Sequence, residues 1–179
     1  MEKKVYLANG LFSAGDRMFN DLICEKLEEA GIEYYAPQKN LAINDKRASA
    51  TSLPIYEGDT EKLKWCNVLI AVLDGVSVDA GVASEVGWAA GWNENHSSAE
   101  AEAARYGDDL PEKKIILGLY TDNRDLSHTD AIKKYEDAIE AGVGESQWPY
   151  VNLYTVGCCK KWGKVFWTLD EVLEYLKTL

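Results

Sequence analysis

The chain has 179 residues, of which 46% are hydrophobic and 11% aromatic, a composition typical of an ordered globular protein. With 19 Lys and Arg against 30 Asp and Glu, its formal net charge of -11 opposes binding to the phosphate backbone of nucleic acids. No apolar run approaches the roughly 20 residues of a membrane-spanning helix, and the first residues lack the apolar core of a secretory signal. We therefore expect a cytoplasmic protein that has neither a nucleic acid nor a membrane as its partner.

The cysteines and histidines favour neither a disulfide framework nor a zinc site. His96 and His128 stand far apart in the sequence. No C-x-x-C pair is present, since two of the four cysteines are isolated and two are adjacent: Cys24, Cys66, Cys158 and Cys159. We expect reduced thiols, no metal and no cofactor.

Strand-like apolar runs alternate with helix-length amphipathic segments, which is the pattern of an α/β protein. A first strand is predicted over residues 4–8, and a helix over 16–31, where apolar residues recur at helical spacing. A second strand follows over 32–37. The irregular segment 38–56 is interpreted as a lid, because such a long loop in a compact domain is usually functional or mobile.

The second half of the chain continues this alternation. A helix is predicted over 57–66, and the unbroken apolar run of 68–74 suits a central parallel strand that is buried on both faces. Another helix starts near Gly81, and the charged, alanine-rich segment 93–112 either extends it or forms an exposed excursion. The remaining predicted elements are a strand over 114–120, a helix over 129–142, a short strand over 151–156 and a helix over 169–179.

Five parallel strands with helices on both faces predict one doubly wound, flavodoxin-like α/β domain that spans residues 1–179. In such folds ligands bind beyond the carboxyl ends of the strands, where the strand order reverses. The ranges at or just after the predicted strand ends are 6–12, 37–38, 74–85 and 120–122, together with Asn152. Candidate site residues within them include Tyr6, Gly10, Phe12, Gln38, Asp74, Asp79 and Glu85.

The stretch DAGVASEVGWAAG, residues 79–91, places Glu85 among glycine and alanine. Asp79 suits a helix cap. Glycine inside a helix costs about 1 kcal/mol relative to alanine, so Gly87 and Gly91 predict that the sheet or a ligand approaches this helix closely. Glu85 is either an exposed acid on a tightly packed helix, or a carboxylate kept ionised near the positive end of the helix dipole and aimed at an electrophile.

The pattern LDG followed by VDAGVASEVGWAAG resembles the D-x-G-T-A-x-E-x-G signature of nucleoside 2-deoxyribosyltransferases. KVYLANGLF resembles the first strand and turn of this family, GDTEKLKWCNVLIAVL its aspartate-bearing helix before the central strand, and VNLY its short asparagine motif. The resemblance runs from residue 4 to about residue 157. It departs from the family at Val82, where threonine is usual.

The resemblance implies an enzyme of nucleotide salvage that transfers 2-deoxyribose between nucleobases through a covalent glycosyl-glutamate intermediate. It implies that Glu85 is the nucleophile, that Tyr6 orients it, that Asp79 passes a proton to the leaving base, and that Asp59 supports the sugar and the acids. Such chemistry needs an ionised carboxylate below the sugar ring and a proton donor beside the base, because bond breaking leaves the sugar positive and the base negative.

The resemblance further implies that Asn152 binds the 5'-hydroxyl, in its own site or a neighbouring subunit's, because these proteins are commonly homo-oligomers with shared pockets. The partners are then deoxynucleosides and free nucleobases. Gly10, Phe12, Gln38 and Asp74 are predicted to contact the substrate.

Alternative interpretations remain open at this point. A hydrolase on the same scaffold would release base and sugar, and Ser13 and Arg17 could then hold a 5'-phosphate. A non-catalytic nucleotide-binding module is less favoured, because G-x-G-x-x-G is missing. Residue by residue, Tyr6 could simply fill the core, and Asn152 could be a turn residue at a strand end.

Overall fold

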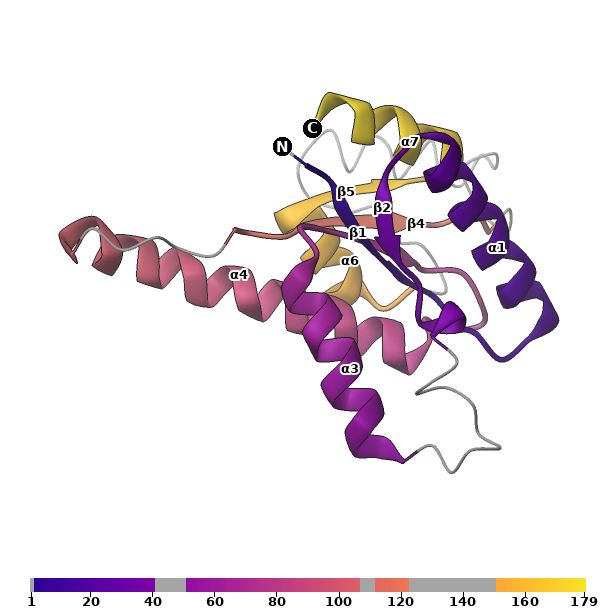
Figure 1. Cartoon of the computed structure of the whole chain (residues 1–179), viewed down its shortest axis with the longest axis horizontal. Helices are drawn as coiled ribbons and strands as arrows, with labels where there is room; N and C mark the ends of the chain where they lie inside the picture. The colour runs from indigo at the N-terminus through magenta and orange to yellow at the C-terminus, as the bar shows by residue number, and fades with distance from the viewer. Residues whose placement is uncertain (1, 41–50, 107–111, 123–150) are drawn as a thin grey trace, which may run out of the picture.

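The computed structural model describes residues 2–40, 51–106, 112–122 and 151–179, and only the backbone of 97–106. Within these ranges the strands form one parallel sheet in the order β2-β1-β3-β4-β5 (Figure 1). The strands are β1 Lys4–Ala8, β2 Glu33–Tyr35, β3 Val68–Val72, β4 Ile115–Leu119 and β5 Gly163–Phe166.

This strand order is that of a flavodoxin-like, doubly wound sheet, and it confirms the predicted fold class. The chain first moves outward from β1 to β2 and then continues on the other side of β1 with β3. The strand order therefore reverses between β1 and β3, and the carboxyl ends of these two strands are where a ligand site is expected.

Helices cover both faces of the sheet (Figure 1). α1 and α7 lie on one face, while α3, α4 and α6 lie on the other (Figure 1). The helices are α1 Ala14–Glu29, the 3-10 turn η1 Pro37–Lys39, α3 Ser52–Trp65, α4 Ala80–Tyr106, α6 Leu153–Trp162 and α7 Leu169–Thr178. Of the helices described, none has both the length and the apolar character that crossing a bilayer requires.

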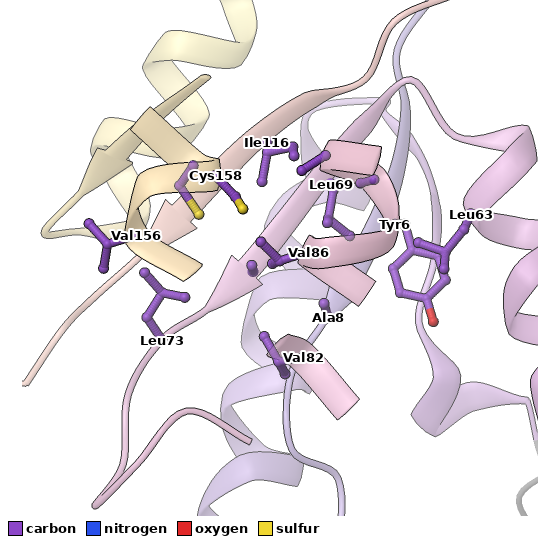
Figure 2. Packing of buried hydrophobic residues seen from close by; sticks show 14 of the residues in the cluster. Tyr6, Ala8, Leu63, Leu69, Leu73, Val82, Val86, Ile116, Val156 and Cys158 are labelled. Carbon is purple, nitrogen blue, oxygen red and sulfur yellow. The ribbon is translucent and has the colours of Figure 1, made fainter. Parts of the chain in front are cut away.

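Two apolar cores hold these layers together. On the α4 side, Val82, Val86 and Ala89 recur at helical spacing and pack against the sheet, as Figure 2 shows for the first two. Every residue of β3 is buried, which confirms the prediction of a central strand that is covered on both faces. On the other side, α1 and α7 bury Ile23 and Leu176 against the sheet.

The predicted strand over 151–156 is wrong. Asn152 instead caps α6, because its Oδ1 accepts hydrogen bonds from the backbone N–H groups of Tyr154, at 3.0 Å, and Thr155, at 3.3 Å. The last strand is β5, further along the chain. It begins at Gly163, where a Cβ would lie 2.1 Å from the carbonyl oxygen of Ile116 in β4, so only glycine allows the two strands this close approach.

Of the two alternatives predicted at Gly87 and Gly91, the close approach of the sheet is wrong, and the close approach of a ligand stays a prediction. A Cβ at either position would meet no atom of the described chain within 4 Å. The extension of this helix is confirmed, since α4 continues to Tyr106 and projects beyond the sheet (Figure 1).

Some sequence-based predictions fall wholly or partly outside the described residues. The helix over 129–142 does so entirely. Of the predicted lid over 38–56, residues 41–50 are not described, and α3 already starts at Ser52.

Candidate active site

A pocket of about 460 Å³ lies at the reversal point between β1 and β3, a volume suited to a small molecule. Its walls come from the turn after β1, from α3 and from the first turns of α4. The lining residues are Asn9, Leu11, Phe12, Pro37, Ile55, Asp59, Asp79, Gly81, Val82 and Glu85.

Glu85 and Tyr6 are joined by a short hydrogen bond at this pocket. The Tyr6 hydroxyl donates to Oε1 of Glu85 at 2.6 Å. Tyr6 is fully buried in β1, where its ring lies beside Leu63 of α3 (Figure 2). The residue thus fills the core and binds a pocket carboxylate, and a short bond of this kind fixes the position of the carboxylate.

The pKa of Glu85 is raised to about 8, mainly because the carboxyl is removed from water. The hydrogen bond from Tyr6 opposes this rise, while the negative charges of Asp59 and Asp79 add to it. The prediction that the helix dipole keeps Glu85 ionised is therefore wrong, because burial outweighs it and raises the pKa of this carboxyl. The dipole acts within the first helical turn, and Glu85 lies beyond that turn of α4.

A second tyrosine–carboxylate pair lies beside the first. The Tyr35 hydroxyl donates to Oδ1 of Asp59 at 3.1 Å and accepts a hydrogen bond from Nδ2 of Asn40, also at 3.1 Å. Burial raises the pKa of Asp59, and the bond from Tyr35 opposes that rise. The rings of Tyr6 and Tyr35 are in contact, with their centroids 5.3 Å apart.

Asp79 caps α4, as predicted, and lines the pocket at the same time. Its Oδ1 accepts hydrogen bonds from the backbone N–H groups of Gly81, at 2.8 Å, and Val82, at 3.3 Å. No donor of the described chain reaches Oδ2 of Asp79. This exposed carboxylate therefore keeps one oxygen available to a ligand.

The family model for nucleoside 2-deoxyribosyltransferases matches residues 5–153, most of the chain. The chain belongs to this family. No match to it is found among curated protein sequences.

Solved structures agree with this family fold. A conserved protein from Enterococcus faecalis V583 is 35% identical over 99% of both chains, with a TM-score of 0.69. A 2-deoxyribosyltransferase from Bacillus psychrosaccharolyticus shares the fold at 15% identity, with a TM-score of 0.52 over 94% of this chain and 89% of that one.

In this deoxyribosyltransferase family member, the four residues predicted to be catalytic meet at one pocket. Asp59, Asp79 and Glu85 line it, and Tyr6 reaches it through its bond to Glu85. Phe12, predicted to contact the substrate, also lines the pocket, with 65% of its surface exposed.

Four other predicted substrate contacts do not line the pocket: Gly10, Gln38, Asp74 and Asn152. Gly10 gives room to Asp16, whose Oδ2 would lie 3.0 Å from a Cβ at this position. Asp74 accepts hydrogen bonds from the backbone N–H of Thr121 at 2.6 Å and from its hydroxyl at 2.5 Å, and so ties the end of β3 to the end of β4.

Three further lining residues, Asn9, Leu11 and Pro37, fall within the ranges that the sequence places at strand ends, whereas Ile55 was missed. Asn9 directly follows β1, so its position at a strand end was a usable signal. Ile55 had no such signal, because an apolar residue within a predicted loop does not indicate a pocket wall.

Ser13 and Arg17, which could hold a 5'-phosphate in the alternative hydrolase, both form hydrogen bonds within the protein. The Ser13 hydroxyl accepts the N–H of Asp16 at 3.0 Å as the cap of α1, and Nη1 of Arg17 donates to the carbonyl oxygen of Phe12 at 2.5 Å. The Asp16 carboxylate accepts a hydrogen bond from the backbone N–H of Ser13 at 3.3 Å. A carboxylate therefore already occupies the helix end where a phosphate would have to bind. Among the residues described, no group of three or more His, Cys, Asp or Glu side chains is placed to hold a metal ion.

Proposed function

We propose that this protein transfers 2-deoxyribose from a nucleoside to a second nucleobase with retention of configuration, through a glycosyl intermediate on Glu85. The observation that carries the proposal is the contact between Tyr6 and Glu85, which fixes one carboxylate oxygen in a pocket of nucleoside size. Membership of the nucleoside 2-deoxyribosyltransferase family supports the same reaction class.

In the first step an oxygen of Glu85 attacks the anomeric carbon, and the bond from this carbon to the base nitrogen breaks. Tyr6 holds Oε1, whereas Oε2 receives no hydrogen bond from the described residues and is the attacking atom in this scheme. The bonding electron pair leaves with the base, whose nitrogen takes a proton from Oδ2 of Asp79. In the second step a nitrogen of the incoming base attacks the same carbon, the bond from this carbon to Glu85 breaks, and the N–H proton of the incoming base passes to the Asp79 carboxylate, which restores the starting acid.

The acid cluster holds the proton that this reaction needs. Since the pKa of Glu85 is about 8, the cluster of Glu85, Asp59 and Asp79 carries a proton at neutral pH. Moving that proton from Glu85 to Asp79 gives one ionised nucleophile and one acid. Asp59 then stabilises the positive charge that develops on the sugar, while Tyr35 holds its carboxylate in place.

The substrate in this proposal is an uncharged nucleoside. Three carboxylates line the pocket, and no lysine or arginine is among the described lining residues, so a 5'-phosphate would meet negative charge. In this proposal the shape of the pocket determines whether the enzyme accepts purine bases, pyrimidine bases or both.

Asn152 would complete the site in a homo-oligomer. Its Oδ1 is used by the cap of α6, but its Nδ2 donates to no described residue and the side chain is exposed. An amide N–H fixed in this way is suited to donate to the 5'-oxygen of a nucleoside in a neighbouring subunit's pocket.

Incubation with deoxyinosine, with and without adenine, tests the proposed reaction. New deoxyadenosine that forms only with adenine supports transfer. Hypoxanthine release at the same rate without adenine would instead mean hydrolysis, and no conversion would favour a binding module. Deoxyinosine 5'-monophosphate in parallel tests the exclusion of phosphate, since faster conversion of the nucleotide would overturn it.

Trapping tests the covalent step. Brief exposure to a 2'-deoxy-2'-fluoro nucleoside, followed by intact-protein mass spectrometry and peptide mapping, should place one glycosyl group on Glu85. The Glu85→Gln variant should show no adduct. An adduct on another residue would contradict the nucleophile assignment.

A further inference from the structure

Asn9 lines the pocket directly after β1 and bears on which substrate groups the pocket accepts. Its amide has a donor end and an acceptor end, and which of them faces a ligand depends on the neighbouring hydrogen bonds. These bonds form a chain of three amides that runs away from the pocket, through Asn20 of α1 to Gln38 of η1.

Gln38 fixes the far end of this chain. One end of its amide lies 2.9 Å from Oδ1 of Asp21 and 3.2 Å from the carbonyl oxygen of Arg17. A carboxylate and a carbonyl only accept hydrogen bonds, so this end is the NH₂ group. The oxygen of Gln38 therefore points to Asn20.

The orientation of the Asn20 amide follows from that of Gln38. Its amide lies 2.9 Å from Oε1 of Gln38 and also 2.9 Å from the carbonyl oxygen of Gly10, two acceptors that both require the NH₂ group at this end. Oδ1 of Asn20 then faces Asn9 at 2.8 Å, which requires Asn9 to donate through its own NH₂. Asn20 is only 3% exposed, and burial makes the cost of a mismatched amide high.

The acceptor end of Asn9 is therefore directed away from α1. No described residue donates to its Oδ1, and this oxygen is not sealed from solvent. We propose that Asn9 determines substrate specificity, its Oδ1 accepting a hydrogen bond from a hydroxyl or amino group of the nucleoside; this inference rests on the proposed function.

The rest of the pocket fits a ligand rich in donors. Besides Asn9, the polar side chains of the lining are the carboxylates of Asp59, Asp79 and Glu85, which accept hydrogen bonds when ionised. A deoxynucleoside offers such donors from two sources, the hydroxyls of the sugar and the exocyclic amine of the base. The experiment must tell these sources apart.

Four substrates distinguish the sources: deoxyadenosine, its analogue without the 6-amino group, 2',3'-dideoxyadenosine and 2',5'-dideoxyadenosine. For wild-type protein and Asn9→Ala, kcat/KM is measured with each as sugar donor. We expect Asn9→Ala to lower kcat/KM about 3- to 10-fold for deoxyadenosine, and to have no effect for the one analogue that lacks the donor of Asn9. The group that this analogue lacks is then the group that Asn9 recognises.

Exposed Asn95 of α4 provides the matched control, because Asn95→Ala removes the same amide outside the pocket and should leave every kcat/KM unchanged. If Asn9→Ala does not fold, as judged by circular dichroism, Asn9→Ser is measured in its place. An equal loss for all four substrates, or no loss for any, overturns the role of Asn9 while leaving the proposed function intact. If wild-type protein neither converts deoxyadenosine nor binds it by calorimetry, the proposed function itself is overturned.

Discussion

Tyr6 and Tyr35 lie opposite each other on the neighbouring strands β1 and β2, and each donates its hydroxyl to a different carboxylate of the pocket. Their rings are in contact, so the positions of Glu85 and Asp59 are linked through the two tyrosines. This arrangement uses the rigid sheet to hold two acids that are carried by separate helices, α4 and α3.

Tyr6→Phe should lower kcat/KM about 10- to 100-fold, because it removes a hydrogen bond to the nucleophilic carboxylate while keeping the ring. The hydroxyl favours the ionised form of Glu85, so its loss raises the pKa of Glu85 further. This disfavours the reactive arrangement, in which the single proton of the cluster lies on Asp79 and not on Glu85. Tyr34→Phe is the control, since Tyr34 lies next to Tyr35 on β2 but donates to Glu28 outside the pocket. Equal activities of the two variants would contradict the role of Tyr6.

Tyr35→Phe should have a smaller effect, a loss of about 3- to 10-fold, because its hydroxyl binds Asp59 and not the nucleophile. The loss is expected in kcat more than in KM, since Asp59 acts on charge that develops only at the transition state. Steady-state kinetics with deoxyinosine and adenine measure this. A change confined to KM would mean that Tyr35 acts on ground-state binding.

The activity of wild-type protein should fall as pH rises through about 8. Below this pH the carboxylate cluster holds the proton that the leaving base requires, and above it this proton is lost as Glu85 ionises. A profile of kcat/KM from pH 5 to 10 measures this decline. A rise through pH 8 would show instead that Glu85 needs only to be ionised and that the proton comes from elsewhere.

Glu85→Gln should stabilise the protein at high pH. The pKa of Glu85 is about 8 in the folded protein against 4.5 for an ordinary glutamate, so the free energy of unfolding falls as pH rises between these values. Glutamine carries no charge, so the free energy of unfolding of the variant does not fall for this reason. We expect similar Tm values for both proteins at pH 5 and a Tm several degrees higher for the variant at pH 9, at about 2 to 4 °C per kcal/mol. Equal Tm values at pH 9 would show that burial does not oppose ionisation of Glu85.

Lys114→Met should destabilise the protein by about 2 to 4 kcal/mol and leave the active site unchanged. Lys114 is buried where α3 ends, and its Nζ donates to the carbonyl oxygens of Lys64, at 3.2 Å, and Cys66, at 2.5 Å. Methionine fills the space but leaves these acceptors without their donor. Urea unfolding measures the loss, and Lys64→Met, at an exposed position of α3, should be nearly neutral.

Local sequence patterns were sufficient to predict the parallel sheet and its doubly wound fold. The alternation of apolar runs with amphipathic segments appears in β1, α1, β3 and α7, and a run buried on both faces such as β3 has little alternative to a central strand. The motif around Glu85, matched with the turn after β1, was sufficient to indicate the family, because these residues are close in the sequence to the strand ends that position them.

Tertiary structure decided what depends on contacts between distant residues. The short apolar run after residue 150 fits a strand or a helix equally well, and only the capping bond of Asn152 and the pairing of β5 with β4 distinguish them. The protonation of Glu85 depends on its burial beside Tyr6 and Asp59, which lie on other elements. The orientation of Asn9 likewise depends on Gln38, because an amide can present either end until its neighbours fix one.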